Sequence, residues 1–383
     1  MSALREYRTD FVSRAGNGPT YGSLCMSSTR HRVKVESLLQ FAVEVLTSMG
    51  VPHDEALVLA DSLVTAERWG HASHGMLRLP WYVARLRSGA MTPVTRCERV
   101  VDQGAIAVLD GHEGIGQVLA REATRLGVER ACAHGVSAVA VRNSNHFGTA
   151  AYFTRWSAEQ GCVALLATNA SPAMAPWGGR VKALGTNPWS IAAPAGRHGV
   201  AVMDMANTAV ARGKIYAAAA RNEPIPATWA ADAHGVPTSD AQAAIKGLIL
   251  PMAGHKGYVI SFMMDVLAGV LTGSQFGANV AGPYEPDRHS GCGHLLITID
   301  VESMMPRAEF ERRLEQLIEA TKAVPRAPGV DEIFFPGELE ALHGARAARH
   351  GIDLPETTWD SLRQLATETG ATLAAGRIGA QTP

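Results

Sequence analysis

The chain has 383 residues, of which 46% are hydrophobic and 19% charged, and it carries a formal net charge of −1 at pH 7. This is an ordinary globular composition with ample material for a large core. The near-neutral charge provides no basic field that would attract nucleic acid or an anionic membrane, so we expect neither as a partner.

The N-terminal region and the cysteines indicate the compartment. The first residues carry charges throughout and lack the apolar core of a secretory signal. The longest apolar stretch, Tyr258 to Thr272, is interrupted by Asp265 and is too short to span a bilayer. The five cysteines include no C-x-x-C pair, which argues against a disulfide framework or a structural zinc site. We therefore expect a cytoplasmic protein with reduced thiols.

The first part of the chain predicts a polar extension followed by helices. Residues 1–30 are polar, glycine-rich and without apolar periodicity, so we expect them to be disordered. Order is expected from near Val33, where apolar residues at helical spacing continue to Met49 and Gly50 stops the helix. A second helix is expected over Asp54–Trp69.

The middle of the chain alternates short β-branched runs with helical patterns, which is typical of an α/β protein with a substantial sheet. The expected strands are Ala105–Leu109, Val136–Val141, Val163–Thr168, Gly199–Met203 and His294–Ile299. The expected helices are Gln117–Ala133, Thr149–Glu159 and Asn207–Arg221.

The last part of the chain is helical again. Helices are expected near Arg307–Ala323, Glu338–Arg349 and Thr358–Glu368. The simplest architecture packs the two terminal helical segments together and inserts the α/β domain between them. The expected boundaries are a helical N-terminal segment at 31–105, the α/β domain at 106–300, and a helical C-terminal segment at 301–383.

A glycine turn between the first expected strand and the following helix resembles a dinucleotide-binding fingerprint. That fingerprint requires a third small residue for close packing of helix on strand. After Gly114 and Gly116 the third position is occupied by Leu119, and the next strand ends in Asn and His rather than in an acidic ribose ligand. We therefore interpret the segment as an ordinary helix entry containing glycine, and predict a fold other than the Rossmann fold.

The segment from Gly70 to Gly89 contains the residue types that a hydroxy-acid enzyme requires. His74, Arg78 and Tyr82 lie at positions i, i+4 and i+8. An arginine grips a carboxylate with two hydrogen bonds, and a histidine with a near-neutral pKa can accept or return the hydroxyl proton. Because Pro80 cannot lie inside a helix, we expect the helix to start near Leu79 and to leave Ser73 and His74 in the preceding turn. A solvated arginine beside a helix-start histidine is the alternative.

Polar residues follow other expected strands at their ends, where α/β proteins tend to bind ligands. His146 lies in the sequence RNSNHFG and is a second candidate acid or base, although a simple turn is the alternative. A T-N-x-S loop contains Ser171. Asp204 ends a strand, and Asn207 is a candidate N-cap whose helix could hold a phosphate. The remaining candidates are Lys256, which precedes a helix, and the loop at 333–338.

A metal site is not indicated by the sequence. His71 and His74 form an H-x-x-H pair without a third ligand at a familiar spacing, and H-E-x-x-H is absent. Serine-hydrolase and P-loop motifs are absent as well.

Seven of these segments occur in an order that resembles the malate/L-lactate dehydrogenase family, from about Val33 to Gly370. They are SHGMLRLPWYVARLRSG, SNHFG, TNASP, GTNPWSIAAP, MDMANTAVARGKI, the GVPTSD to LPMAGHKGY stretch, and FPGE. The family also includes sulfolactate, ureidoglycolate and diketogulonate oxidoreductases and a reductase of cyclic imino acids. The resemblance implies a largely antiparallel or mixed sheet that binds NAD or NADP, with NAD favoured, and a homodimer.

The resemblance also implies residue roles. It implies that His74 or His146 transfers the proton, and that Ser73, Arg78 and Tyr82 bind a small carboxylate substrate. The positions that match family contacts to the cofactor are Ser171, Asp204, Met205, Ala206, His255, Lys256, Pro336, Gly337 and Glu338. The expected activity is hydride transfer between NAD(P)H and a small 2-keto or 2-hydroxy acid. The alternatives are a reductase of a cyclic imino acid and a catalytically silent binding protein on the same fold.

Overall fold

The computed structural model describes residues 30–374 and is organised around one seven-stranded sheet. The strand order is β2-β3-β4-β10-β5-β6-β7, and only β3 and β4 run parallel. The strands are β2 (Glu98–Gln103), β3 (Ile106–Asp110), β4 (Val136–Ser144), β5 (Cys162–Thr168), β6 (Trp189–Pro194), β7 (Val200–Met205) and β10 (Cys292–Asp300). The expected α/β class with a largely antiparallel, mixed sheet is confirmed.

The centre of the sheet is made by a strand that comes late in the chain. In β10, Leu296 lies opposite Val139 of β4 on one side and Leu166 of β5 on the other. All three side chains are buried, so the register places apolar residues in a continuous core. Two strands of this sheet were not expected from the sequence. The first, β2, is a polar edge strand, and β6 has its apolar pattern interrupted by small residues.

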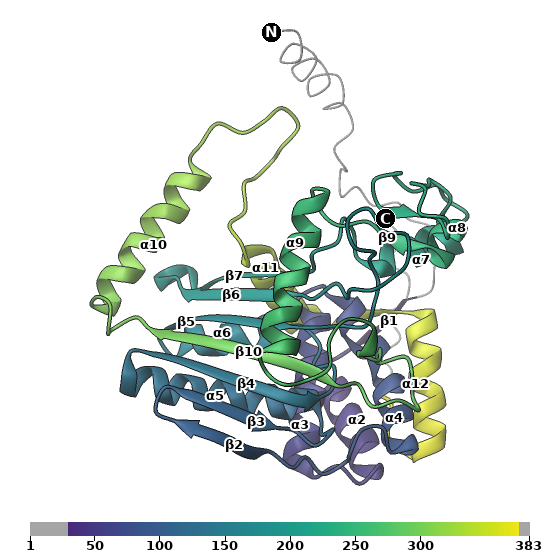
Figure 1. The fold of residues 1–383 in the computed structure, drawn as a ribbon, viewed down its shortest axis with the longest axis horizontal. Coiled ribbons are helices and arrows are strands. Elements are labelled where there is room, and N and C mark those ends of the chain that lie inside the picture. Colours follow the sequence, from purple (N-terminus) through teal and green to yellow (C-terminus); the bar gives the residue numbers. More distant parts are fainter. Residues whose placement is uncertain (1–29, 375–383) are drawn as a thin grey trace.

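Helices cover both faces of this sheet. Figure 1 shows α5 (Gly116–His134) and α6 (Ala151–Glu159) behind the sheet and α9 (His255–Asp265) in front of it. A π-helical turn, Val266–Val270, continues α9 and packs on the central strands. The sheet is therefore buried on both faces, which explains why its inner strands read as nearly continuous apolar runs.

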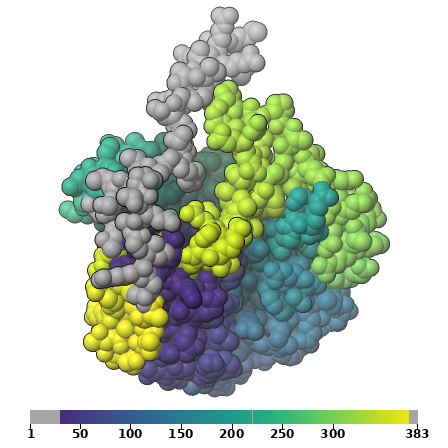
Figure 2. Space-filling view, turned by 180° about the vertical axis from the view of Figure 1, so that it is seen from behind, coloured from purple at the N-terminus to yellow at the C-terminus, as the bar shows by residue number. Residues whose placement is uncertain are grey.

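The two ends of the described chain share one hydrophobic core. The contributing helices are α2 (Val35–Ser48), α3 (His53–Arg68), α4 (Leu79–Ser88), α11 (Glu338–His350) and α12 (Glu356–Thr369). Strand β1 (Arg30–Val33) pairs antiparallel with β11 (Ile352–Pro355). Figure 2 shows the purple N-terminal helices directly beside yellow α12. Residues 1–29, most of the expected extension, lie outside the described residues.

A small helical unit with its own hydrophobic cluster lies beside the sheet. It consists of α7 (Arg212–Ala220), α8 (Ala241–Lys246) and the short strands β8 (Ala230–Ala231) and β9 (Leu248–Ile249). The expectation that Asn207 caps α7 is wrong, because the helix begins five residues later. The Asn207 amide is buried and donates to the carbonyl oxygens of Thr186 and Asn187 instead.

The remaining helix is α10 (Arg307–Lys322), which projects from the body of the molecule in Figure 1. None of the helices in the part of the chain from 30 to 374 combines the length and the apolar character needed to cross a membrane.

The glycine turn before α5 is packed by the protein itself. A Cβ added at Gly116 would lie 2.2 Å from the carbonyl oxygen of Asn145, and one added at Gly111 would lie 2.4 Å from the Leu119 side chain. The Asn145 amide donates to the carbonyl oxygens of Glu113 and Gly114. These glycines thus permit close packing of the helix entry against the loop that carries Asn145 and against Leu119.

Candidate active site

The segment that carries Ser73 and His74 is a pair of single-turn 3₁₀ helices between α3 and α4. The first spans Ala72–His74 and the second Met76–Arg78, and α4 then begins at Leu79 with Pro80 in its first turn. Proline is tolerated there because that position has no intrahelical N–H partner to lose. The expected helix start is confirmed, and the 3₁₀ turns rather than a common helix face position His74 and Arg78.

A buried carboxyl group holds this segment in place from below. Glu67 on α3 accepts a hydrogen bond from the Met76 backbone N–H at 2.8 Å. A Cβ at Gly75 would lie 2.3 Å from the Glu67 Oε1 atom, so a larger residue there would displace the Glu67 carboxyl group. Burial raises the pKa of Glu67 to about 7.

His146 lies in the loop after β4, and its ring stacks against that of His74. The ring centroids are 5.9 Å apart and the planes are inclined by 15°. Ser73 Oγ lies 2.9 Å from His74 Nδ1. Two imidazoles from distant parts of the chain therefore share one half-buried site, with the Nε2 atom of each ring free of a hydrogen bond to the described residues.

A hydrogen-bond relay orients His146. The Gln117 amide, on α5, donates to the Tyr82 hydroxyl at 2.8 Å, and that hydroxyl lies 2.7 Å from His146 Nδ1. The Gly148 backbone N–H donates to His146 Nδ1 at 3.3 Å, so this nitrogen is an acceptor. The tyrosine hydroxyl therefore donates to it as well, and Nδ1 is unprotonated in the neutral ring. The proton of neutral His146 is consequently on Nε2.

Both imidazoles are neutral in the free protein at neutral pH. Burial, and then the charges of Arg78 and His71, lower the pKa of His74 to about 4. Burial together with the charges of His74 and Arg78 lowers the pKa of His146 well below its ordinary value. The expectation of a histidine with a near-neutral pKa is therefore wrong for this free site, because desolvation disfavours the charged ring.

Arg78 lies at the edge of the imidazole pair without an acidic partner. Its Nε donates to the Ser73 carbonyl oxygen at 2.6 Å, and its guanidinium lies 4.1 Å from the centroid of the Trp81 ring. Among residues 30–374, no carboxylate forms an ion pair with it. Trp81 contacts Tyr284 edge-on, and the Tyr284 hydroxyl is 3.2 Å from Ser171 Oγ. These contacts connect the expected substrate residues with Ser171.

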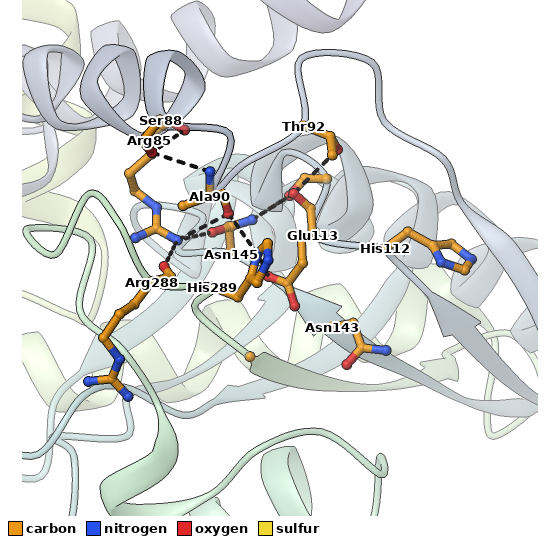
Figure 3. A network of polar contacts seen from close by, with 12 residues as sticks. Arg85, Ser88, Ala90, Thr92, His112, Glu113, Asn143, Asn145, Arg288 and His289 are labelled. Atoms are coloured by element: carbon orange, nitrogen blue, oxygen red, sulfur yellow. Dashed lines mark hydrogen bonds and ion pairs between the residues drawn. The ribbon is translucent and has the colours of Figure 1, made fainter.

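A buried arginine on α4 ties two loops of the site together. The Arg85 guanidinium donates to the Asn145 side-chain oxygen at 2.9 Å and to the carbonyl oxygens of Glu285 and Arg288 at 2.6 and 2.9 Å. Figure 3 shows Arg85 pointing from its helix toward Asn145 and Arg288. The network holds the loop before β10 against the loop that carries His146.

Asp204 does not point into open space at the end of β7. Its carboxylate accepts hydrogen bonds from Thr149 Oγ1 at 2.5 Å and from the Ala151 backbone N–H at 2.8 Å. It thus satisfies the start of α6, and burial raises its pKa. Met205 pairs with Trp189, so this segment is held as part of the sheet.

His255 and Lys256 are exposed at the first turn of α9. Ala253, just before this turn, has a φ of +47°, a left-handed conformation that costs free energy for alanine. The His255 ring contacts Trp177 edge-on at 5.9 Å. A strained turn that leads into a helix start with an exposed lysine suits the phosphates of a dinucleotide.

The segment Pro336–Glu338 lies along the edge of β7. The Val202 backbone N–H donates to the Pro336 carbonyl oxygen at 3.0 Å, and Glu338 accepts from the Phe335 backbone N–H at 3.0 Å. Gly337 has a φ of +94°, and a Cβ there would lie 2.6 Å from the Val202 side chain. This segment therefore lies alongside β7, the strand that carries Asp204.

A family model described as malate/L-lactate dehydrogenase matches residues 33–363. The chain belongs to this family. It is 37% identical over 337 residues to the L-sulfolactate dehydrogenase of Methanothermobacter thermautotrophicus, with 88% of this chain and 97% of that protein covered. It is 38% identical over 331 residues to the (2R)-3-sulfolactate dehydrogenase (NADP(+)) of Chromohalobacter salexigens, with 85% and 95% covered.

Two further comparisons extend the family relationship. The NAD(+)-dependent ureidoglycolate dehydrogenase of Escherichia coli K12 is 33% identical over 335 residues, with 86% of this chain and 95% of that protein covered. The solved structure of sulfolactate dehydrogenase from Methanocaldococcus jannaschii aligns with a TM-score of 0.84 at 35% identity, covering 90% and 98% of the two chains. This family member is therefore a nicotinamide-dependent hydroxy-acid dehydrogenase.

Two residues of the site were missed in the sequence, and both act through other residues. Gln117 and Arg85 are almost completely buried polar side chains, at 0% and 1% exposure. Arg85 lies inside the Gly70–Gly89 segment, and Gln117 lies just after the glycine turn before α5. Both stand within an apolar helix pattern, where a polar residue is unusual unless it has buried partners. That position was the only signal in the sequence, because the partners come from other elements.

Proposed function

We propose that this family member interconverts a small 2-hydroxy acid and the corresponding 2-keto acid, of the malate, lactate or sulfolactate type. The observation that carries the proposal is the half-buried imidazole pair, His74 and His146, beside an arginine that lacks an acidic partner among residues 30–374. A carboxylate at Arg78 would supply that partner and would place the adjacent C2 oxygen near the imidazoles.

The proposed roles follow from this arrangement. A bound nicotinamide supplies the hydride to C2 in one direction and accepts it in the other. As the new C–H bond forms in reduction, the carbonyl electron pair moves to oxygen, and that oxygen takes a proton from Nε2 of His74 or His146. Ser73 holds His74 through its Nδ1, and Tyr82 holds His146 in the same way. Oxidation of the hydroxy acid returns the proton to the same nitrogen.

The proposed cofactor site combines the family positions described above. Ser171, the end of β7 at Asp204 to Ala206, and the segment Pro336–Glu338 would hold the nucleoside parts. His255 and Lys256 would face the phosphates from the start of α9. Relatives are named for NAD(+) and for NADP(+), so either cofactor is proposed for this chain.

The test is oxidation of NADH and of NADPH with a panel of 2-keto acids. The panel should also contain a cyclic imino acid, because the chain is 30% identical to the solved structure of a delta1-piperideine-2-carboxylate reductase with a TM-score of 0.79. We expect turnover with at least one 2-keto acid. His74→Ala and His146→Ala should each slow the single-turnover rate, the proton-transferring residue by about a hundredfold to ten-thousandfold. Tight cofactor binding without any turnover would point to a silent binding protein.

We further propose that the protein is a homodimer. Large apolar side chains are exposed along α9 and the π-helical turn, among them Phe262, Val270 and Leu271. Such a concentration of exposed apolar residues is typical of a protein interface. Light scattering should give twice the chain mass, and Leu271→Glu should shift the mass toward that of a single chain.

A further inference from the structure

Two thiols and a carboxyl group meet at one end of the sheet. Cys132 lies in the last turn of α5, Cys162 is the first residue of β5, and Asp300 is the last residue of β10. Their two sulfur atoms and a carboxylate oxygen all lie within 4.8 Å of one another. Figure 1 shows this end of β10 at the side of the sheet where the chain continues into α10. None of the roles proposed above uses these three side chains.

The sheet and the helix hold the three groups in place. Cys162 and Asp300 lie directly opposite each other on neighbouring antiparallel strands, so their side chains are on the same face. The Asp300 backbone N–H donates to the carbonyl oxygen of Gly135 at 3.0 Å, which fixes the end of α5 to the same strand. Cys162 is fully buried, whereas Cys132 is exposed, so an ion can reach the cluster from solvent.

The turn that follows β10 orients the carboxylate. Its Oδ2 atom accepts hydrogen bonds from the backbone N–H and the hydroxyl of Ser303 at 2.9 and 2.7 Å. Supporting hydrogen bonds of this kind commonly fix carboxylates that ligate metals. Within residues 30–374 no basic side chain forms an ion pair with Asp300, and the guanidinium of nearby Arg307 donates to Glu311 at 2.7 Å instead.

The thiols of this cluster require a cation in order to ionise. Burial, and then the charges of Cys132 and Asp300, raise the pKa of Cys162 to about 12, so its thiol is protonated at neutral pH. A metal ion reverses this balance, because it deprotonates the thiols that coordinate it. Zinc binds thiolate and carboxylate ligands tetrahedrally with zinc–sulfur bonds of about 2.3 Å, so two sulfur ligands lie about 3.8 Å apart. The observed separations of at most 4.8 Å are close to this arrangement.

We propose that Cys132, Cys162 and Asp300 form a Zn²⁺ site, with water as the fourth ligand. Each cysteine releases its thiol proton as the ion binds, and the metal is then held by two thiolates and one carboxylate. No C-x-x-C pair marks the site in the sequence, because its ligands come from three separate elements.

The metal site is structural and independent of the proposed function. Ile299, next to Asp300, pairs with Val136, the first residue of β4, whereas His146 follows the last residue of that strand. The ion therefore lies at the other end of the central strands from the imidazole loop. There it joins the end of α5 to β5 and β10.

Titration of the reduced, chelator-treated protein with Zn²⁺ and with Co²⁺ tests the site. We expect one ion per chain at this site, a thiolate-to-cobalt charge-transfer band in the near ultraviolet, and release of about two protons per ion. Cys132→Ser should abolish the band and weaken Zn²⁺ binding at least about a hundredfold, the upper range for loss of a group that merely supports a ligand. Because Cys132 is exposed, this variant is expected to fold.

Two further variants sharpen the test. Asp300→Asn keeps an acceptor for Ser303 and removes the anionic ligand, so it should also weaken Zn²⁺ binding. Cys97→Ser changes another exposed thiol, outside the cluster, and is the matched control that should bind as the wild type does. Saturating Zn²⁺ should raise the melting temperature of the wild type and of Cys97→Ser, but not that of Cys132→Ser, because only the folded chain brings the three ligands together.

Three results would overturn the site. The first is equal binding of Zn²⁺ by the wild type and by Cys132→Ser. The second is an equal loss of binding in Cys97→Ser, which would show that exposed thiols bind the ion without specificity. The third is formation of a Cys132–Cys162 disulfide in place of metal binding, which would assign the pair to redox chemistry.

Discussion

At the scale of single residues, the chemistry depends on how strongly desolvation lowers the pKa values of the two imidazoles. His74 and His146 are desolvated and lie near the positive charge of Arg78, and all of these effects favour the neutral ring. In the free protein the pair is thus ready to accept a proton from a hydroxy acid. A carboxylate bound at Arg78 adds negative charge beside the rings and raises their pKa, which favours the protonated donor needed for reduction.

We predict an acid limb near pH 4 in the oxidation of the hydroxy acid. The proton acceptor must be neutral, and the lowered pKa of His74 keeps it neutral down to about pH 4. The value of kcat/KM, which reports the free enzyme, should therefore hold through pH 6.5 and fall only as the pH drops toward 4. Rapid-mixing measurements between pH 3.5 and 8 would check this. A midpoint at 6.5 would contradict the structure.

The relay from Gln117 through Tyr82 predicts a specific loss. Tyr82→Phe removes one of the two donors to His146 Nδ1 and leaves the Gly148 backbone N–H at 3.3 Å. The loss of one net hydrogen bond is worth about 0.5–1.5 kcal/mol, which corresponds to a rate loss of about twofold to tenfold. Gln117→Leu should have a smaller effect, since the tyrosine hydroxyl remains. Long-range ¹⁵N–¹H spectra report which imidazole nitrogen carries the proton. An unchanged ¹⁵N chemical shift of His146 Nδ1 together with an unchanged rate in Tyr82→Phe would contradict the relay.

At the scale of secondary-structure elements, close packing of helix starts and turns positions the site. The start of α5 contacts the backbone of the His146 loop at Gly116, and the carboxyl group of Glu67 on α3 supports the turn that carries His74. The two imidazoles thus depend on two contacts that leave no room for an additional side-chain atom.

Gly116→Ala should be destabilising, although alanine is the better helix former. Its Cβ would lie 2.2 Å from the Asn145 carbonyl oxygen and 2.6 Å from that of His146, so the loop must move. We expect a loss of about 1–3 kcal/mol in the free energy of unfolding, together with reduced turnover. Gly213→Ala on α7, where nothing lies within 4 Å of the added atom, is the control and should be neutral or slightly stabilising. Equal behaviour of the two variants would refute the argument.

Glu67→Gln should stabilise the protein at alkaline pH. The folded pKa of about 7 lies above the unfolded value, so the wild type loses stability as the pH rises from 4.5 through 7. Glutamine keeps the acceptor for the Met76 N–H and does not titrate. We expect the free energies of unfolding of the two proteins to be closest at pH 5. At pH 8.5 the variant should be more stable by up to about 3 kcal/mol and should have the higher melting temperature. A constant difference across pH would show that Glu67 does not titrate in this range.

At the scale of the whole molecule, the two ends of the described chain are joined through one core. Met76, Leu79 and Tyr82 from the site segment belong to the same hydrophobic cluster as Trp359 and Leu362 of α12. The helix α12 therefore supports the substrate side of the site through this shared core.

Leu362→Ala tests this connection. The side chain is fully buried, so its truncation should cost about 2–5 kcal/mol in the free energy of unfolding. Activity and tertiary structure should be lost at the same denaturant concentration, since the site segment and α12 share a core. Gln364→Ala, at an exposed position of the same helix, should have little effect. Loss of α12 structure while activity persists would contradict the shared core.

The local sequence determined the helices and most inner strands, because the spacing of apolar residues along each element is visible in the sequence itself. The helices near residues 33–69 and 307–369 and the strands that lead to His146 and Ser171 follow from such patterns. The turn before Leu79 follows as well, since proline is tolerated only in the first turn of a helix and Pro80 therefore marks the helix start. The motifs also indicated the family and its candidate residues.

Only the tertiary structure decided which of these segments meet. β10 lies between β4 and β5, although more than a hundred residues of chain separate it from either strand; the Thr168–His294 hydrogen bond alone spans 126 positions. Three features of the site depend on that arrangement. They are the stacking of His74 on His146, the hydrogen bonds from the start of α6 to Asp204, and the burial of Gln117 and Arg85. Such contacts are set by the loops and crossovers that bring distant segments together, and a local period of two or 3.6 residues carries no information about them.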